Sequence, residues 1–208
     1  MRLGLFGGTF DPIHYGHLIL AEQCREQISL DRVRFVPAGD PPHKRGRVRT
    51  PARQRAEMIE MAIAGHEPFE LATLEIDRTG PSYTVDTLEQ LGRDDPECEL
   101  FFLIGSDSLA DLSTWREPKR IAELATLVVV TRPDAPLPDF SDLVPLLGTA
   151  GVETVKRHVV EMPLIGISST DLRRRVHQGR SIRYLLPRAV ECYIKEQGLY
   201  GDGGRGAP

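Results

Sequence analysis

Short apolar segments alternate along this chain with longer segments in which apolar residues recur at helical spacing. Four segments of six or seven residues have the length and composition of buried β-strands: 1–6, 32–37, 99–105 and 126–131. Further strands are expected over residues 69–76 and 158–160. The regular alternation of strands and helices predicts an α/β fold, a Rossmann-like doubly wound, mostly parallel sheet with helices on both faces.

Capping residues indicate where several helices begin and end. Thr50 is expected to cap a helix that has Pro51 at its first position and runs to about Ala64. Three hydroxyl residues at 168–170 precede a helical run, and Gly179 is its expected stop. Further helices are expected from about residue 15 to 28 and over 82–88, 140–147 and 187–198.

The length of 208 residues predicts a single domain over residues 1–200, followed by a disordered C-terminal tail, GDGGRGAP, over 201–208. No apolar stretch approaches 18 residues, and the first residues enter a strand without a signal-peptide pattern. Three scattered cysteines indicate free thiols in a reducing compartment. We therefore expect a cytoplasmic protein without a membrane partner, and a homo-oligomer is compatible with the sequence.

The net charge of −4 argues against a general nucleic-acid partner. Two basic segments nevertheless stand out in the acidic chain, at residues 43–49 and 173–188. A run of charge usually forms a solvated face, but two such segments also fit a substrate that carries several phosphates. An RNA-binding protein is the non-enzyme alternative, and it is weakened because aromatic residues do not interleave with these arginines.

The loop after the first strand has the features of an anion site. Gly7 and Gly8 lack a Cβ, so the backbone can approach a phosphate, and the helix expected near Tyr15 offers unpaired N–H groups. His14 and His17 lie three residues apart, so both imidazoles can face the end of the sheet and donate hydrogen bonds to phosphoryl oxygens. The glycine-lysine patterns of the standard phosphate loops are absent from this sequence.

Zinc binding is the alternative for the two histidines. A His-x-x-His pair supplies two ligands, and Cys24, Cys98 and Cys192 do not have ligand spacing. Zinc is therefore disfavoured.

Other candidate residues follow later strands, where open α/β sheets bind their ligands. Lys44 lies in a Pro- and Gly-rich loop and either reaches a phosphate or belongs to a mobile surface loop. Asp107 is suited to accept hydrogen bonds from ribose hydroxyls. Trp115, the sole tryptophan, is either a core residue or a platform that stacks on an aromatic ring.

Two helix starts offer further anion sites. The first N–H groups of the helix near Thr84, with the Thr84 hydroxyl, can receive a carboxylate, although ordinary capping by Ser82 explains the same pattern. The hydroxyls of 168–170, with Arg173 one turn along, form a cradle suited to a polyphosphate. We expect this cradle and the histidine turn to meet at one edge of the sheet.

Six motifs, in this order, resemble those of the bacterial nicotinate mononucleotide adenylyltransferases, which belong to the nucleotidyltransferases with an (H/T)xGH motif. They are GGTFDPIHYGH at 7–17, PPHK at 41–44, SYTVDTL at 82–88, GSDSLADLSTW at 105–115, TRP at 131–133 and ISSTDLR at 167–173. The first and last motifs specify only the superfamily, which includes pantetheine-phosphate adenylyltransferases and cytidylyltransferases. The PPHK loop, the SYT turn and Trp115 narrow the resemblance from the superfamily to this family.

The resemblance implies an enzyme of NAD biosynthesis that joins ATP and nicotinate mononucleotide to give nicotinate adenine dinucleotide and pyrophosphate. Nicotinamide mononucleotide and phosphopantetheine are the alternative acceptors. Mg²⁺ is expected to arrive with ATP, with few or no protein ligands. Arg116 departs from the family pattern, because relatives often carry an aromatic residue such as tyrosine after the tryptophan.

The resemblance also implies a role for each site residue. The catalytic residues are His14, His17 and Arg173. The ATP-binding residues are Gly7, Gly8, Thr9, Phe10, Gly105, Asp107, Ile167, Ser168, Ser169 and Thr170. The mononucleotide-binding residues are Lys44, Thr84, Trp115 and Arg132.

Overall fold

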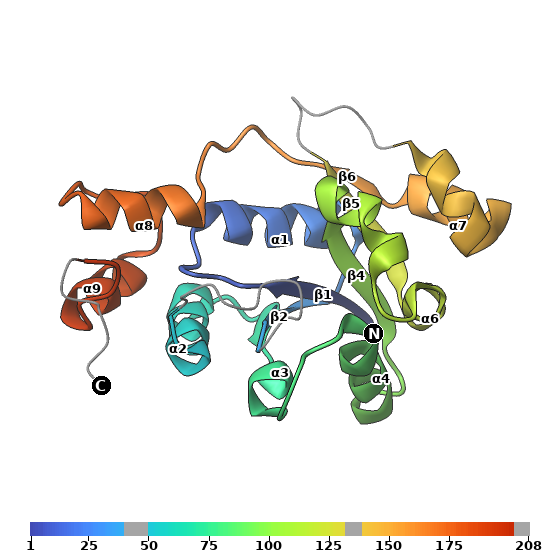
Figure 1. The fold of residues 1–208 in the computed structure, drawn as a ribbon, viewed down its shortest axis with the longest axis horizontal. Helices are drawn as coiled ribbons and strands as arrows, with labels where there is room; N and C mark the ends of the chain where they lie inside the picture. The colour runs from blue at the N-terminus through green and yellow to red at the C-terminus, as the bar shows by residue number, and fades with distance from the viewer. Residues whose placement is uncertain (40–49, 132–138, 202–208) are drawn as a thin grey trace.

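The protein contains a six-stranded parallel sheet in the order β3-β2-β1-β4-β5-β6 (Figure 1). The computed structural model describes residues 1–39, 50–131 and 139–201. The strands are β1 (Arg2–Gly8), β2 (Arg32–Pro37), β3 (Phe69–Leu71), β4 (Glu99–Gly105), β5 (Thr126–Thr131) and β6 (Val159–Glu161). The predicted fold class is confirmed. The strand order reverses between β1 and β4, which is where doubly wound sheets bind ligands.

Alternate residues of the central strand β4 pack into two separate hydrophobic cores. Phe101 and Leu103 of β4 join one buried cluster, whereas Phe102 and Ile104 join the other. Helices α1 (Tyr15–Ile28), α2 (Ala52–Ile63), α8 (Ser169–His177) and α9 (Arg188–Glu196) pack on the first cluster. Helices α4 (Thr84–Asp94), α5 (Ser106–Ala110), α6 (Pro118–Leu124) and α7 (Val144–Arg157) pack on the second. The sheet is therefore covered on both faces.

Several element boundaries agree with the sequence analysis. Strands β2, β4 and β5 have the predicted bounds, and α1 begins at Tyr15. Helix α8 ends at His177, and Gly179 follows with a φ of 65°, the left-handed conformation typical of a glycine after a helix. Pro187 occupies the N-cap of α9.

Other expectations were wrong because tertiary contacts override the local pattern. The third strand ends at Leu71, and Leu74–Asp77 forms a helical turn, α3. Pro51, in place of Thr50, occupies the N-cap of α2, while the Thr50 N–H donates to Asp11 Oδ2 over 3.3 Å. Instead of one short helix over 140–147, a 3₁₀ turn (Phe140–Leu143) leads into α7, whose backbone is interrupted at Gly148.

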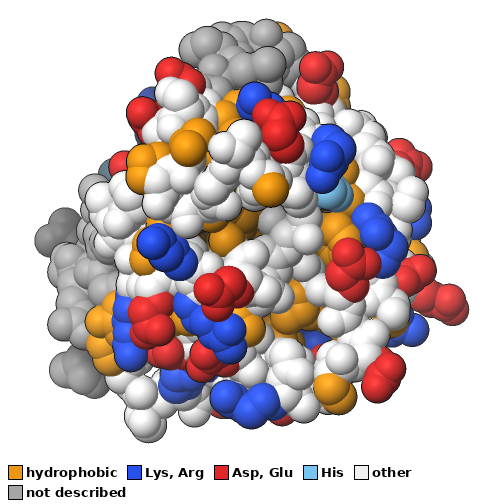
Figure 2. Space-filling view, turned by 90° about the vertical axis from the view of Figure 1, so that its right-hand side faces the viewer, with side chains coloured by type: hydrophobic (Ala, Val, Ile, Leu, Met, Phe, Trp, Pro, Cys, Tyr) orange, Lys and Arg blue, Asp and Glu red, His pale blue; other side chains and the backbone are white. Residues whose placement is uncertain are grey.

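The face that includes α6 and α7 mixes acidic and basic side chains (Figure 2). Arg120 of α6 pairs with Glu89 and Glu123, and Lys156 of α7 pairs with Glu153. Such exposed pairs contribute little stability, and this mixed face has the character of a solvated surface. No helix in the described ranges is long and apolar enough to cross a membrane.

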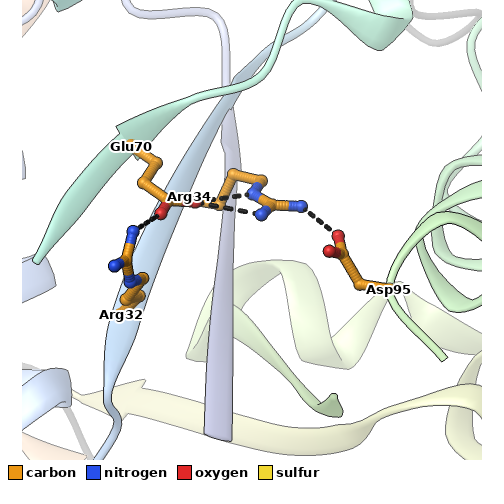
Figure 3. A network of polar contacts seen from close by, with 4 residues as sticks. All are labelled: Arg32, Arg34, Glu70 and Asp95. Carbon is orange, nitrogen blue, oxygen red and sulfur yellow. Dashed lines mark hydrogen bonds and ion pairs between the residues drawn. The ribbon is translucent and has the colours of Figure 1, made fainter. Parts of the chain in front are cut away.

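An ion-pair network holds the C-terminal end of α4 against the sheet (Figure 3). Arg34 of β2 donates to Glu70 Oε2 over 2.9 and 3.1 Å and to Asp95 Oδ2 over 2.6 Å. Arg32 also pairs with Glu70, but its side chain is 49% exposed, compared with 16% for Arg34. Arg34 therefore links β2, β3 and α4 in a partly buried site, where a charge-assisted bond is stronger than at the surface.

We expect Arg34→Gln to lower the free energy of unfolding by about 1–2 kcal/mol, because Glu70 and Asp95 lose their shared partner. Arg32→Gln is the matched control and should cost less than about 0.5 kcal/mol. Urea unfolding at an unchanged m-value measures both. Equal losses in the two variants would contradict a special role for Arg34.

Candidate active site

A buried carboxylate anchors the loop between β1 and α1. Asp11 accepts hydrogen bonds from the Tyr200 hydroxyl (2.6 Å) and from the Thr50 N–H (3.3 Å), and only 5% of the residue is exposed. Burial and the neighbouring Asp11 carboxylate raise the pKa of Tyr200 well above its ordinary value, so the phenol keeps the proton that it donates. The loop is thus fixed by the C-terminal part of the chain.

The two histidines of this loop lie against each other. Their rings are stacked, with centroids 3.8 Å apart, and His14 is 5% exposed. A Cβ at Gly16 would lie 3.0 Å from Nδ1 and Cε1 of His14. The glycine between the histidines therefore lets the His14 ring pack against the start of α1.

Hydrogen bonding and burial define the state of both imidazoles. The His14 N–H donates to Nδ1 of His17 over 3.3 Å, so a neutral His17 carries its proton on Nε2. Burial lowers the pKa of His14 to about 4, and burial with the neighbouring His14 lowers the pKa of His17 well below its ordinary value. Both rings are neutral near pH 7 and can act as hydrogen-bond donors, not as fixed charges.

The start of α8 lies beside the same loop. The Ser169 hydroxyl donates to the Pro12 carbonyl over 2.9 Å, and Nη1 of Arg173 donates to the Asp11 carbonyl over 2.6 Å. The expectation that the histidine turn and the hydroxyl-rich cap meet at one edge of the sheet is confirmed.

The cap hydroxyls have partners within the protein. Ser168 caps α8 by accepting from the Asp171 N–H over 3.2 Å, and Thr170 accepts from Nη2 of Arg173 over 3.3 Å. Unpaired backbone N–H groups in the first turn of α8 are therefore the readiest donors for an anion. Ile167 is half-buried and packs on the first core cluster.

The ATP-binding residues predicted in the first loop differ in what they expose. The Phe10 side chain is 2% exposed and packs edge-on to Phe6, so its side chain belongs to the core. Gly7 is exposed, and Gly8 and Thr9 are half-buried. Any nucleotide contact at Phe10 would therefore involve its backbone.

A cavity of about 390 Å³ adjoins this loop at the ends of β1 and β2. Gly7, Gly8, Thr84, Phe102, Trp115 and Arg116 are among its lining residues. Trp115 is half-buried, lies edge-on to Phe102 with ring centroids 6.1 Å apart and packs on the second core cluster. Trp115 therefore packs on the core and also lines the cavity, while its stacking on a ligand ring stays a prediction.

The N-terminus of α4 faces this cavity through Thr84. Ser82 does not cap the helix as local propensity predicts: Tyr83 occupies the N-cap, and the Ser82 hydroxyl donates to the Glu75 carbonyl over 3.4 Å. Gly105 ends β4, and Asp107 is exposed in the first turn of α5. Lys44 and Arg132 lie outside the described residues.

Sequence reasoning missed two residues that shape the site. Arg55 of α2 is 2% exposed and donates to the carbonyls of Thr9, Ala38 and Thr50 over 2.6, 2.7 and 3.1 Å. Glu75 lines the cavity and accepts from the Thr87 hydroxyl over 2.9 Å, and burial raises its pKa. The sequence did contain a signal for Arg55: it falls at helical spacing with the apolar residues 58, 59 and 63, on the face predicted to be buried.

The fold and this site together are typical of a nucleotide-binding α/β protein of the Rossmann-like class, with hydrogen-bond donors suited to an anion near the switch point of the sheet. The profile of the cytidylyltransferase-like family matches residues 5–175. A probable nicotinate-nucleotide adenylyltransferase of Thermomicrobium roseum is 49% identical over 96% of this chain and 91% of its own length. A Thermus thermophilus protein of the same description is 50% identical over 96% of this chain and 100% of its own length.

Similarity also extends to solved structures. Plasmodium falciparum nicotinic acid mononucleotide adenylyltransferase complexed with NaAD superposes with a TM-score of 0.76, at 18% identity, over 96% of this chain and 97% of that chain. At this identity the likeness supports the fold alone. The sequence matches go further: the chain belongs to the cytidylyltransferase-like family and, within it, to the nicotinate-nucleotide adenylyltransferases.

The neutral state of His14 predicts an acid-sensitive fold. Above pH 6.5 the residue is neutral in both folded and unfolded chains, but between pH 6.5 and about 4 the unfolded chain alone takes up the proton. The stability should therefore fall by up to about 3 kcal/mol over this range. In His14→Gln the urea midpoint should fall less as the pH decreases. The control His66→Gln changes a half-exposed surface residue and should show the same fall as the wild type. If the urea midpoint falls equally with decreasing pH in all three proteins, His14 is not a buried neutral residue.

Proposed function

We propose that this protein transfers the adenylyl group of ATP to nicotinate mononucleotide, releasing pyrophosphate and forming nicotinate adenine dinucleotide. The observation that carries the proposal is the direct hydrogen bonding of the histidine loop to the start of α8, beside a cavity lined by an aromatic ring. This arrangement offers one site for a triphosphate and an adjacent site for a pyridine nucleotide. The names of its close relatives support the same reaction.

The chemistry needs alignment and charge stabilisation, with no covalent nucleophile from the protein. A phosphate oxygen of the mononucleotide is already anionic and attacks the α-phosphorus of ATP. The bond from the α-phosphorus to the bridging oxygen breaks, and its electron pair leaves with pyrophosphate. The protein must hold two mutually repelling phosphates in line and place donors where charge builds.

We assign the ATP side to three segments. His14 and His17 donate to the phosphates, with Nε2 of His17 nearest the reacting phosphorus. Arg173 and the first-turn N–H groups of Ser169 and Thr170 bind the leaving phosphates, and Ser168 orders that turn. Gly7 to Phe10 contact the nucleotide through backbone, Ile167 lines its approach, and Gly105 and Asp107 bind the ribose.

We assign the mononucleotide side to the cavity. The N–H groups at Thr84 receive the ring carboxylate, and Trp115 stacks on the pyridine. Lys44 and Arg132 are proposed to bind the mononucleotide phosphate on the strength of their motifs. A cytoplasmic location and a homo-oligomeric state stay predictions.

A divalent cation is expected to accompany ATP, as is typical of enzymes that use it. In the described ranges, no group of three or more His, Cys, Asp or Glu side chains has the geometry of a metal site. Triphosphate oxygens and water would therefore supply most ligands, which is the usual mode for Mg²⁺. When bound, the cation would neutralise phosphate charge.

The reaction is tested by pyrophosphate release from ATP and Mg²⁺ with three acceptors in parallel. We expect the highest kcat/KM with nicotinate mononucleotide, because donors placed for a carboxylate are left unmatched by nicotinamide mononucleotide or phosphopantetheine. A higher kcat/KM with nicotinamide mononucleotide or phosphopantetheine would identify that compound as the acceptor in place of nicotinate mononucleotide. No release with any acceptor, combined with tight, salt-dependent RNA retention, would favour the binding-protein alternative.

His17→Ala should lower kcat by about 10²-fold or more, because a preorganised donor to the transition state is lost, with less effect on ATP binding. His17→Gln is the matched variant, since its amide can return a donor near the position of Nε2 and should recover part of the rate. Steady-state kinetics with separate ATP titrations measure both effects. Full activity in His17→Ala would exclude the histidine from the mechanism.

A further inference from the structure

Arg116 lies at the cavity proposed for the pyridine ring. It lines this cavity next to Trp115, and its guanidinium carbon lies 4.7 Å from the centroid of the Tyr83 ring. Tyr83 is the N-cap of α4 and also lines the cavity. The guanidinium is thus held over the first turn of α4 by a cation–π contact.

The ion pairs of Arg116 are loose. Its nitrogens lie 3.5 Å from Asp86 Oδ2 and 3.5 Å from Glu117 Oε1, and its side chain is about half exposed. Charge-assisted hydrogen bonds between arginine and carboxylate are usually about 2.7–2.9 Å long. A guanidinium has five N–H donors. Arg116 can therefore turn donors toward a ligand without first breaking a short bond.

Two sources of positive potential converge on this part of the cavity. The first N–H groups of α4 lie at Thr84, at the positive end of the helix dipole, and Arg116 adds a full charge beside them. Asp86 and Glu117 offset part of this charge. Asp111 and Glu75 also line the cavity, and burial raises the pKa of Glu75, which makes its charged form less favourable there.

We propose that Arg116 is a specificity-determining residue that favours the acidic pyridine mononucleotide over its amide by placing its guanidinium beside the ring carboxylate. This inference rests on the proposed function. A carboxylate accepts two parallel N–H bonds from a guanidinium and carries a full negative charge, whereas an amide is neutral and has one oxygen acceptor. The backbone donors at Thr84 are placed for a carboxylate oxygen, and the Arg116 guanidinium adds a full positive charge that only the acid can pair with.

Binding can be measured without turnover because Trp115 is the only tryptophan of the chain. Its fluorescence should report binding of either mononucleotide in the cavity. The dissociation constants of nicotinate and nicotinamide mononucleotides are then measured for the wild type, Arg116→Gln and Arg116→Lys. Arg120→Gln is the matched control, because Arg120 forms exposed pairs with Glu89 and Glu123 on α6.

We expect Arg116→Gln to weaken binding of the acid by about 5- to 10-fold and to leave binding of the amide within about 2-fold. Arg116→Lys should keep part of the preference, because it retains the charge but loses the two-pronged geometry. The wild-type preference should decline with added salt, and that of Arg116→Gln should not. Arg120→Gln should match the wild type.

An unchanged acid-to-amide ratio in Arg116→Gln overturns the inference, and so does an equal loss for both ligands, which would indicate packing alone. Wild-type protein that binds neither mononucleotide also overturns it. A failure of the proposed function looks different: selective binding of the acid with no pyrophosphate released from ATP would refute adenylyl transfer while leaving the role of Arg116 in recognition intact.

Discussion

The site depends on hydrogen bonds between segments about 160 residues apart in the sequence. Arg173 and Ser169 donate to consecutive carbonyls of the first loop, at Asp11 and Pro12. The Asp11 carboxylate is in turn bound by Tyr200, near the end of the described chain. An anion-binding loop between a strand and a helix is a local feature, but its position relative to the second donor set is fixed only by these contacts. The C-terminal helices therefore complete the proposed phosphate site.

Burial gives the histidine pair its chemical character. Two imidazoles stacked at 3.8 Å would repel each other if both were protonated, and desolvation adds to that cost. Neutral rings avoid the repulsion and keep an N–H on Nε2 of His17, oriented by the backbone N–H of His14. Such a donor needs little reorganisation when a phosphate arrives. In the proposed site the positive charge comes from Arg173 and the helix ends, and the histidines supply oriented neutral hydrogen-bond donors.

The sequence predicted those features that depend on local chemistry. Strands β2, β4 and β5, the start of α1 at Tyr15 and the Ser168 cap follow from periodicity and capping rules. The pattern failed where distant residues compete for the same groups: Ser82 bonds to the Glu75 carbonyl instead of capping α4. The role of Arg55 could not be predicted, because its three carbonyl acceptors belong to segments that only the folded structure brings together.

Arg55 also explains how the two proposed subsites keep a fixed relation. Its guanidinium donates both to the Thr9 carbonyl, in the loop proposed for ATP, and to the carbonyl of Ala38, which follows β2 and lines the cavity proposed for the mononucleotide. Both acceptors are carbonyls, so a shift of either backbone segment would leave a buried N–H donor unpaired, at a cost of about 1–3 kcal/mol. In-line attack tolerates little misalignment between two phosphates. A buried arginine that ties both walls of the site to α2 therefore serves alignment, the task that this chemistry demands most from the protein.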